Sequence, residues 1–169
     1  MHIRSAVPAD ANAMLKIYAP IVRTTSISFE IEPPTLEEFE HRIEKYAQGW
    51  TWLVAEENGQ LLGYAYGSSH RERLAYKWST ETSAYVHEGS RRRGVGKLLY
   101  EALLPALATK GYCNAYAGIA LPNAPSISLH HSVGFVSIGQ FPAVGRKFGR
   151  WHDVGWFHRK LRAEPISEA

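Results

Sequence analysis

The sequence predicts a mixed α/β domain in which a central sheet carries helices on its faces. Two observations lead to this fold class. Short segments rich in β-branched and aromatic residues alternate along the chain with longer segments whose apolar residues recur at helical spacing. Glycine, proline and asparagine stand at the boundaries between these segments. The length of 169 residues suits one ordinary domain, and we expect a single domain over residues 1–169.

The first third of the chain predicts one strand and two helices. A short strand is expected at residues 3–6, and Pro8 opens a helix because proline is favoured in a first helical turn. After a polar and β-branched loop at residues 24–34, the capping-box pattern of residues 35–38 starts a second helix. Gly49 ends that helix.

A hairpin and a further strand are expected in the middle of the chain. Strands at residues 50–56 and 61–67 flank Asn58-Gly59, a pair that tolerates the positive φ angles of a tight turn. Another strand follows at residues 79–87, directly before the segment that carries the strongest functional signal.

The last third predicts a long helix, three strands and a short helix. The long helix spans residues 94–110 and contains Pro105, which should bend it or open one backbone hydrogen bond. Gly111 ends this helix. The elements after it are a strand at 114–121, a short helix at 123–132, and strands at 135–144 and 151–161.

Composition argues against several classes of protein. The hydrophobic fraction of 45% and the charged fraction of 21% are typical of a globular chain. No stretch approaches the roughly 20 apolar residues of a membrane span, and the single cysteine, Cys113, rules out a disulfide-stapled fold or a zinc cluster. A net charge of +3 does not suggest a nucleic-acid partner. The first residues contain no apolar run, so we expect a cytoplasmic protein.

The most informative segment is VHEGSRRRGVGKLL at residues 86–99, where a strand enters a basic, glycine-punctuated turn that opens a helix. The free N–H groups and positive dipole of a helix start bind phosphate, and Gly94 and Gly96 would let the backbone approach a ligand closely. A Walker loop is excluded because Val95 follows Gly94, and a dinucleotide fingerprint because Leu99 replaces its third small residue. A helix cap with a solvated basic patch is the alternative interpretation.

Two patterns, in the right order, resemble the signatures of the GNAT acetyltransferases. They are Arg91-x-x-Gly94-x-Gly96 after a strand, and Asn123-x-x-Ser126 followed by His130 and Gly134-Phe135. The resemblance implies the GNAT fold, a mostly antiparallel central sheet of about six to seven strands flanked by helices. It also implies acetyl-CoA as co-substrate, with its pyrophosphate in the glycine turn, and no metal. The residues expected to contact acetyl-CoA are Val86, His87, Arg91, Arg92, Arg93, Gly94, Val95, Gly96, Lys97, Asn123 and Ser126, with backbone N–H groups near the first two holding the thioester carbonyl.

Three further runs resemble the phosphinothricin N-acetyltransferases and their methionine-sulfoximine-acetylating relatives. They are AYKWSTETSAYV at 75–86, LPNAPS at 121–126 and GRWHDVG at 149–155. The resemblance implies direct transfer, through a ternary complex, of an acetyl group to the amino group of a small amino acid analogue, of the phosphinothricin, methionine sulfoximine or methionine sulfone type. It further implies a role in resistance and a homodimer with the late strands near the subunit contact, without nucleic acid or membrane as partner.

Acetyl transfer to an amine requires a base for the ammonium, a polarised thioester carbonyl and a stabilised leaving thiolate. The resemblance places a catalytic glutamate at Glu81, which would accept the proton directly or through water. His130 is the second candidate catalytic residue, as an acid or as a second base. In the alternative interpretation Glu81 pairs with Lys77 at the surface, and the His130 ring packs on Phe135.

Six residues are candidates for binding the acceptor. They are Phe29, Arg73, Tyr76, Trp78, Lys147 and Phe148. Arg73 would grip a carboxylate or phosphinate at two points, Lys147 would add charge, and the aromatic rings would exclude water. Alternatively, these cations are solvated and the rings belong to the core.

Three other functions stay open at the level of sequence. The acceptor would be a peptide or protein N-terminus or another amine in the first, and the chain would bind acyl-CoA without catalysis in the second. In the third, the arginine run at residues 91–93 would bind nucleic acid, although the modest charge counts against it.

Overall fold

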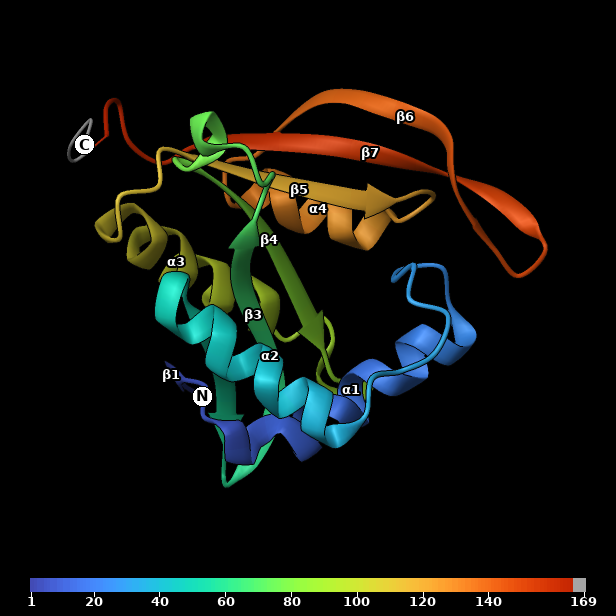
Figure 1. Ribbon diagram of the computed structural model, residues 1–169. Helices are drawn as coiled ribbons and strands as arrows, with labels where there is room; N and C mark the ends of the chain where they lie inside the picture. Colours follow the sequence, from blue (N-terminus) through green and yellow to red (C-terminus); the bar gives the residue numbers. More distant parts are fainter. Residues whose placement is uncertain (166–169) are drawn as a thin grey trace.

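The computed structural model describes residues 1–165, whose strands form a seven-stranded sheet (Figure 1). The strands are β1 (His2–Ser5), β2 (Trp52–Glu57), β3 (Gln60–Ser69), β4 (Ser79–Val86), β5 (Asn114–Ala120), β6 (Val136–Lys147) and β7 (Arg150–Lys160). Their order is β1-β2-β3-β4-β5-β7-β6, and only β4 and β5 run parallel. The expected α/β fold with a mostly antiparallel sheet is confirmed.

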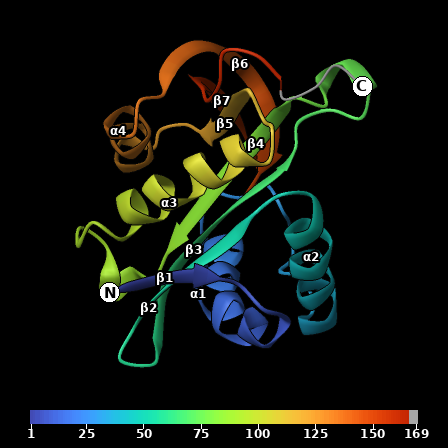
Figure 2. The ribbon, with the colours of Figure 1, turned by 90° about the vertical axis from the view of Figure 1, so that its left-hand side faces the viewer.

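Helices cover both faces of the sheet (Figure 2). On one face, α1 (Ala11–Thr24) and α2 (Leu36–Gly49) pack with β2 and β3 around a core that contains Met14, Ile43 and Tyr64. On the other face, α3 (Val95–Thr109) forms a second core against the sheet, and α4 (Ala124–Ser132) joins it through Ile127 and Leu129. The sheet therefore separates two apolar cores, and a residue on a strand belongs to one or the other according to its face.

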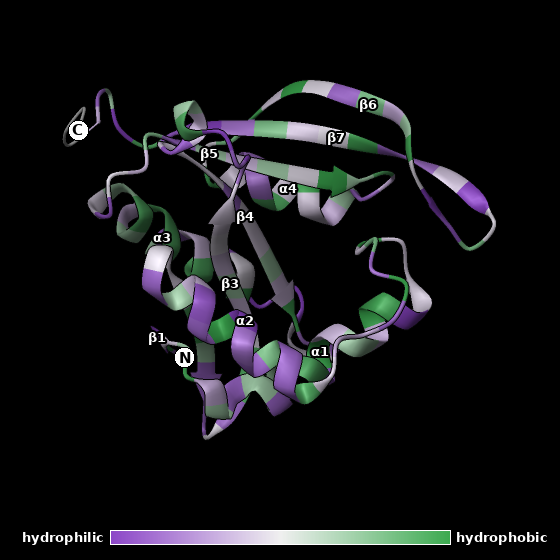
Figure 3. Cartoon of the chain, viewed as in Figure 1, coloured by the Kyte–Doolittle hydropathy of each residue, from purple (hydrophilic) through white to green (hydrophobic). Residues whose placement is uncertain are grey.

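Local sequence signals explain where the elements begin and turn. Thr35 caps α2, because its Oγ1 accepts a hydrogen bond from Glu38 N–H and Glu38 Oε2 accepts one from Thr35 N–H at 2.7 Å. Asn58 and Gly59 adopt φ angles of 51° and 75°, as the tight hairpin turn requires. Only Phe39 and Ile43 of α2 are buried, and polar residues recur on its outward side in Figure 3.

Several element boundaries differ from the expected ones, and for two of them the structure shows the physical reason. The second strand starts at Trp52 rather than residue 50, because Trp50 N–H donates to Tyr46 O and completes the last turn of α2. The sixth strand continues to Lys147, because a bulge carries residues 142–144 outward and the pairing with β7 then resumes. Helix α3 continues through Pro105 to Thr109.

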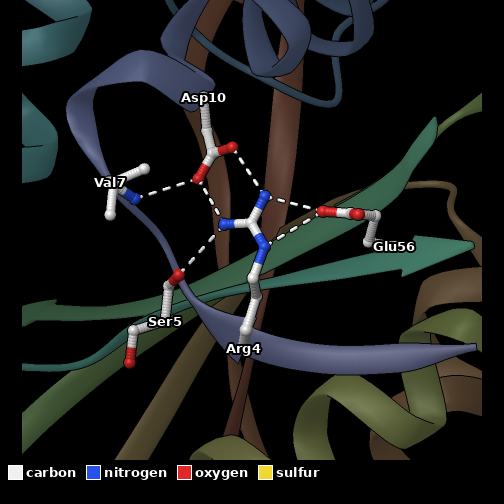
Figure 4. Close-up of polar contacts among 5 residues, drawn as sticks. All are labelled: Arg4, Ser5, Val7, Asp10 and Glu56. Atoms are coloured by element: carbon white, nitrogen blue, oxygen red, sulfur yellow. Dashed lines mark hydrogen bonds and ion pairs between the residues drawn. The ribbon is translucent and has the colours of Figure 1, made fainter. Parts of the chain in front are cut away.

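An ion-pair cluster fastens the first strand at the edge of the sheet (Figure 4). The Arg4 guanidinium contacts Asp10 at 2.7 and 2.8 Å and Glu56 at 2.7 and 3.0 Å. The Arg4 hydrogen bonds lower the pKa of the Asp10 carboxyl. This cluster joins β1, the turn before α1 and β2, so it supports the fold at the β1 edge, whereas the candidate site lies at β4 and β5.

Candidate active site

The sheet opens between β4 and β5 (Figure 1). Their parallel pairing covers Ser79–Glu81 against Asn114–Tyr116 and stops there, while β4 stays paired with β3 and β5 with β7. A cavity of about 50 Å³ occupies the gap. It is lined from the α1–α2 side by Ile27, Ser83 and Tyr85, and from the α3–α4 side by Thr82, Ala84, Tyr100, Ala117, Ile119, Asn123, Ser126 and His130, with Gly118 and Ala120 of β5.

The backbone of β4 presents alternate amides to this gap. His87 N–H donates to Leu62 O at 2.8 Å on the β3 side, and Trp78 O accepts from Cys113 N–H on the β5 side. Because strand amides alternate in direction, Val86 and Ala84 direct theirs toward the gap. The His87 amide, expected to share in holding a carbonyl, is therefore committed to the sheet, whereas the Val86 amide faces the opening.

The glycine turn leads from β4 into α3 and leaves amides free at the helix start. Gly94 adopts φ +80°, a left-handed conformation that favours glycine, and nothing lies within 4 Å of where its Cβ would be. The first hydrogen bond within the helix is Leu98 N–H to Gly94 O, so the amides of residues 95–97 have no partner inside the helix. Gly96 also lets two helices pack closely, because a Cβ there would lie 2.9 Å from Leu129 of α4.

The basic residues of the turn do not act alike. Arg93 reaches back to pair with Glu57 at the end of β2. Arg91 and Arg92 are exposed, and Lys97 lies 3.8 Å from Glu101 one helical turn later. Arg91 and Arg92 are thus exposed in the turn that precedes the free amides, whereas the side chains of Arg93 and Lys97 each lie near a carboxylate.

The second predicted pattern lies at the start of α4, across the gap from β4. Asn123 Oδ1 accepts a hydrogen bond from Ser126 N–H at 3.2 Å and caps the helix. Ser126 O accepts from His130 Nδ1 at 2.7 Å. Asn123, Ser126 and His130 all line the cavity, so the structure brings the three together.

His130 is a buried imidazole with both nitrogens engaged. Its Nδ1 donates to Ser126 O, and its Nε2 accepts from the Tyr100 hydroxyl at 2.9 Å. Burial lowers the pKa of His130, and burial raises the pKa of the Tyr100 hydroxyl, so both groups are held neutral. The His130 ring also packs edge-on against Phe135 at 5.1 Å, so the cavity contact and the packing contact coexist.

Glu81 lies on the opposite face of β4 from this pair. Its neighbour Thr82 contacts Tyr100 on the α3 side, and side chains of successive strand residues alternate. Glu81 Oε1 lies 2.9 Å from His70 Nδ1, and the His70 ring stacks on Tyr116 of β5 at 4.7 Å. His130 lines the cavity, whereas Glu81 is not among the residues that line it and lies on the opposite face, at the last paired position of β4 with β5.

The candidate acceptor residues fall into two groups. Tyr76 lies edge-on to His70 at 5.7 Å and so belongs to the surroundings of Glu81. Arg73 is exposed at the start of the same short turn, and Trp78 is half-buried just before β4. The other group contains Phe29, from the loop after α1, and Lys147 and Phe148, from the β6–β7 hairpin.

Lys147 joins that hairpin to the loop after α1. Lys147 is 4% exposed, and its ammonium donates to Val22 O and Ser28 O, both at 2.7 Å. Phe29 lies against Gly145, whose missing Cβ leaves room for its ring. Lys147 is therefore bound to the protein itself, and Phe148 is exposed at the hairpin turn.

Sequence reasoning missed four residues of the site: His70, Tyr100, Tyr116 and Trp156. Tyr116 pairs in register with Glu81, and Trp156 lies over Gly118 and edge-on to His70. The alternation along the strand at 114–121 would have put Tyr116 on the polar face. That Glu81 is its neighbour in the sheet could not be predicted, because the two residues lie on different strands. Nothing in the sequence near His70 indicated its pairing with Glu81.

The described part of the chain also bears on metal binding and on membrane insertion. Within residues 1–165, the structure contains no group of three or more His, Cys, Asp or Glu side chains placed to hold a metal ion. None of the helices described is long and apolar enough to cross a membrane.

The parallel strand pair that opens beside the glycine turn is the candidate site, and comparison with known proteins shows the class of the chain. The family model described as an acetyltransferase (GNAT) domain matches residues 3–156. The chain belongs to this family and is an acetyltransferase.

Three relatives illustrate the likeness. The phosphinothricin N-acetyltransferase of Streptomyces viridochromogenes is 37% identical over 98% of this chain and 91% of its own. The L-methionine sulfoximine/L-methionine sulfone acetyltransferase of Salmonella typhimurium is 35% identical over 100% of this chain and 99% of its own. The phosphinothricin acetyltransferase of Sinorhizobium meliloti, solved in complex with acetyl-CoA, is 32% identical with a TM-score of 0.92, covering 99% of this chain and 91% of that one.

Proposed function

We propose that the protein transfers the acetyl group of acetyl-CoA directly to the amino group of a small amino acid analogue, of the phosphinothricin, methionine sulfoximine or methionine sulfone type. One observation carries the proposal: the cavity between β4 and β5 is lined from both faces of the sheet. Free helix amides stand on one side and the Glu81 carboxylate on the other. Two substrates can thus meet in the gap from opposite faces, as a ternary complex requires.

The chain fits acetyl-CoA on the α3–α4 side. The amides of residues 95–97, with Arg91, Arg92 and Lys97 beside them, match the charge of a diphosphate. Gly94 leaves open space above the turn. The outward amides of β4 suit the amide groups of an extended chain lying in the gap, and the Val86 and Ala84 amides can stabilise negative charge on the thioester oxygen.

Glu81 acts on the acceptor side. Its carboxylate attracts the acceptor ammonium and removes a proton, directly or through one water, which frees the nitrogen lone pair to attack the thioester carbon. The nitrogen then gives its extra proton to water, the carbon–sulfur bond breaks, and the thiolate takes up a proton from water as it leaves. The Tyr100 hydroxyl, kept protonated by burial, lies at the cavity and can turn its one hydrogen from His130 Nε2 to the departing sulfur. In this scheme His130 orients Tyr100 and does not itself exchange the proton.

We also propose a homodimer that acts in the cytoplasm. The β6–β7 hairpin carries large apolar side chains that are 46–62% exposed: Val136, Ile138, Phe141, Val144 and Trp151. Such a concentration is typical of an interface. Light scattering after gel filtration should give twice the chain mass of 19.0 kDa, and a monomer mass would contradict the proposal.

The proposed activity is tested by following thiol release from acetyl-CoA. The acceptor panel contains phosphinothricin, methionine sulfoximine, methionine sulfone, free methionine and a short peptide with a free N-terminus. The proposal predicts turnover with one or more of the three analogues and intersecting initial-velocity lines. Turnover with the peptide alone would overturn the acceptor class, and parallel lines would overturn direct transfer. Acetylation of such an analogue would confer resistance to it.

A further inference from the structure

We propose that His70 is a positioning residue for Glu81: its Nδ1–H fixes one carboxylate oxygen so that the other meets the acceptor ammonium. The proposal rests on the proposed function, in which Glu81 removes the ammonium proton. The contact itself joins His70 Nδ1 and Glu81 Oε1 at 2.9 Å. An ionised carboxylate can only accept, so Nδ1 carries the hydrogen.

The His70 ring is held in place by aromatic side chains from three elements. It stacks on Tyr116 of β5 at 4.7 Å with an interplanar angle of 18°. Tyr76 from the loop before β4 and Trp156 from β7 meet it edge-on, at 74° and 79°. A ring fixed on these sides cannot swing away, so the orientation of its Nδ1–H is set before any ligand arrives.

The carboxylate is less enclosed than the imidazole that holds it. The Glu81 side chain is 32% exposed, against 14% for the His70 side chain. Among the hydrogen bonds of the described residues, Glu81 Oε1 has His70 as partner and Oε2 has none. One oxygen is therefore anchored and the other is free for a cationic acceptor, which is the arrangement that a directional base needs.

His158 provides a matched control for this argument. It lies on the same face of the sheet and packs on the same Tyr116 ring, at 5.0 Å. Its Nε2, however, contacts Asn114 Oδ1 at 2.9 Å, with no carboxylate involved. The two histidines thus share an aromatic neighbour and differ in the group they bind, so a role in packing alone would make their substitutions equivalent.

The test compares His70→Phe, His70→Asn and His158→Phe with the wild type, measuring kcat, both KM values and the melting temperature. Phenylalanine keeps a ring on Tyr116 and loses the donor, whereas the asparagine amide nitrogen occupies roughly the place of Nδ1. We expect His70→Phe to lower kcat about 10-fold or more with the acetyl-CoA KM unchanged within about 2-fold. In His70→Asn, the loss of kcat should be at most about half that of His70→Phe when both losses are expressed as logarithms. His158→Phe should change kcat less than about 2-fold.

A double-variant cycle separates positioning from a structural role. If His70 acts through Glu81, adding His70→Phe to Glu81→Gln lowers kcat by less than about 2-fold further. Three results would each overturn the inference. In the first, the double variant loses kcat by the product of the two single losses. In the second, His70→Phe leaves kcat unchanged, and in the third, His70→Asn has no higher kcat than His70→Phe. A wild-type protein that turns over no acceptor would instead overturn the proposed function, so the two failures are distinguishable.

Discussion

The two faces of the sheet at β4 build their parts of the site in different ways. The α3–α4 face uses one continuous run, residues 86–97, whose backbone amides and glycine turn need few particular side chains. The α1–α2 face collects side chains from distant segments, among them Phe29, His70, Tyr116 and Lys147. Backbone geometry suits the diphosphate that we assign to the first face, because every acetyl-CoA molecule carries the same diphosphate. Side chains gathered from many elements suit the acceptor, because they can differ from one relative to another.

The largest effect should come from removing the base on the acceptor face. Glu81→Gln keeps the size and the contact with His70 but cannot take a proton, so kcat should fall about 10² to 10⁴-fold. Acetyl-CoA affinity, measured by calorimetry, should stay within about 2-fold of the wild type, because the cofactor contacts lie on the other face. An unchanged kcat would remove Glu81 from the reaction and break the division of roles between the faces.

The link between the hairpin and the loop after α1 gives the next largest effect. Lys147→Met leaves two buried carbonyls, Val22 O and Ser28 O, without their donor. The free energy of unfolding should fall by about 2 kcal/mol, because buried acceptors lose their hydrogen bonds. The acceptor KM should rise about 5-fold, because Phe29 loses its support, while the acetyl-CoA KM stays within about 2-fold.

The control for that variant is Lys160→Met, at the exposed end of β7. It should leave stability and both KM values unchanged. If Lys147→Met also left the acceptor KM unchanged, the loop after α1 would not belong to the acceptor face.

A substitution in the glycine turn should affect the other face alone. Gly94→Ala forces a side chain into φ +80°, at a cost of about 1 kcal/mol, which corresponds to about a 5-fold weaker acetyl-CoA affinity if the turn relaxes. Gly89→Ala, in the same segment but without a positive φ, is the matched control and should bind normally. Equal affinities for the two variants would show that the turn conformation does not set cofactor binding.

The smallest effect concerns the buried imidazole and the pH dependence of folding. Burial lowers the pKa of His130 below its ordinary value of 6.5, so below about pH 6.5 the unfolded chain takes up a proton that the folded chain refuses. Stability should therefore fall from pH 7.5 to 5.5, and His130→Gln should weaken this decline. His158, whose pKa burial also lowers, contributes in the same direction, so part of the slope remains.

Urea titrations at the two pH values measure that slope, with His41→Gln as the control because its side chain is exposed on α2, away from His130. An identical slope in wild type and His130→Gln would mean that His130 takes up a proton as readily in the folded chain as in the unfolded one.

The same contrast explains how much could be predicted from the sequence. The helix cap at Thr35, the hairpin at Asn58-Gly59 and the glycine turn depend on neighbouring residues, and the expected elements formed there. The closeness of Gly96 to Leu129 could not be predicted, because it arises between two helices and no local pattern contains it.

The acceptor face could be predicted only in part, since its contacts join residues far apart in the chain. Glu81 and His70 are eleven residues apart, and Lys147 lies 119 positions from Ser28, whose carbonyl it binds. The sequence marked Lys147 as a cation near the acceptor, but it could not reveal that two carbonyls of the protein already hold it. Such pairings depend on the register of strands and on the path of loops, which are set by the whole fold.

The most direct test of the account is a crystal structure of the protein with coenzyme A and methionine sulfoximine bound together. The account predicts the diphosphate at the amides of residues 95–97, the pantetheine chain in the gap between β4 and β5, and the acceptor nitrogen on the Glu81 side of the sheet. Coenzyme A bound away from that gap, or both ligands entering from one face, would contradict it.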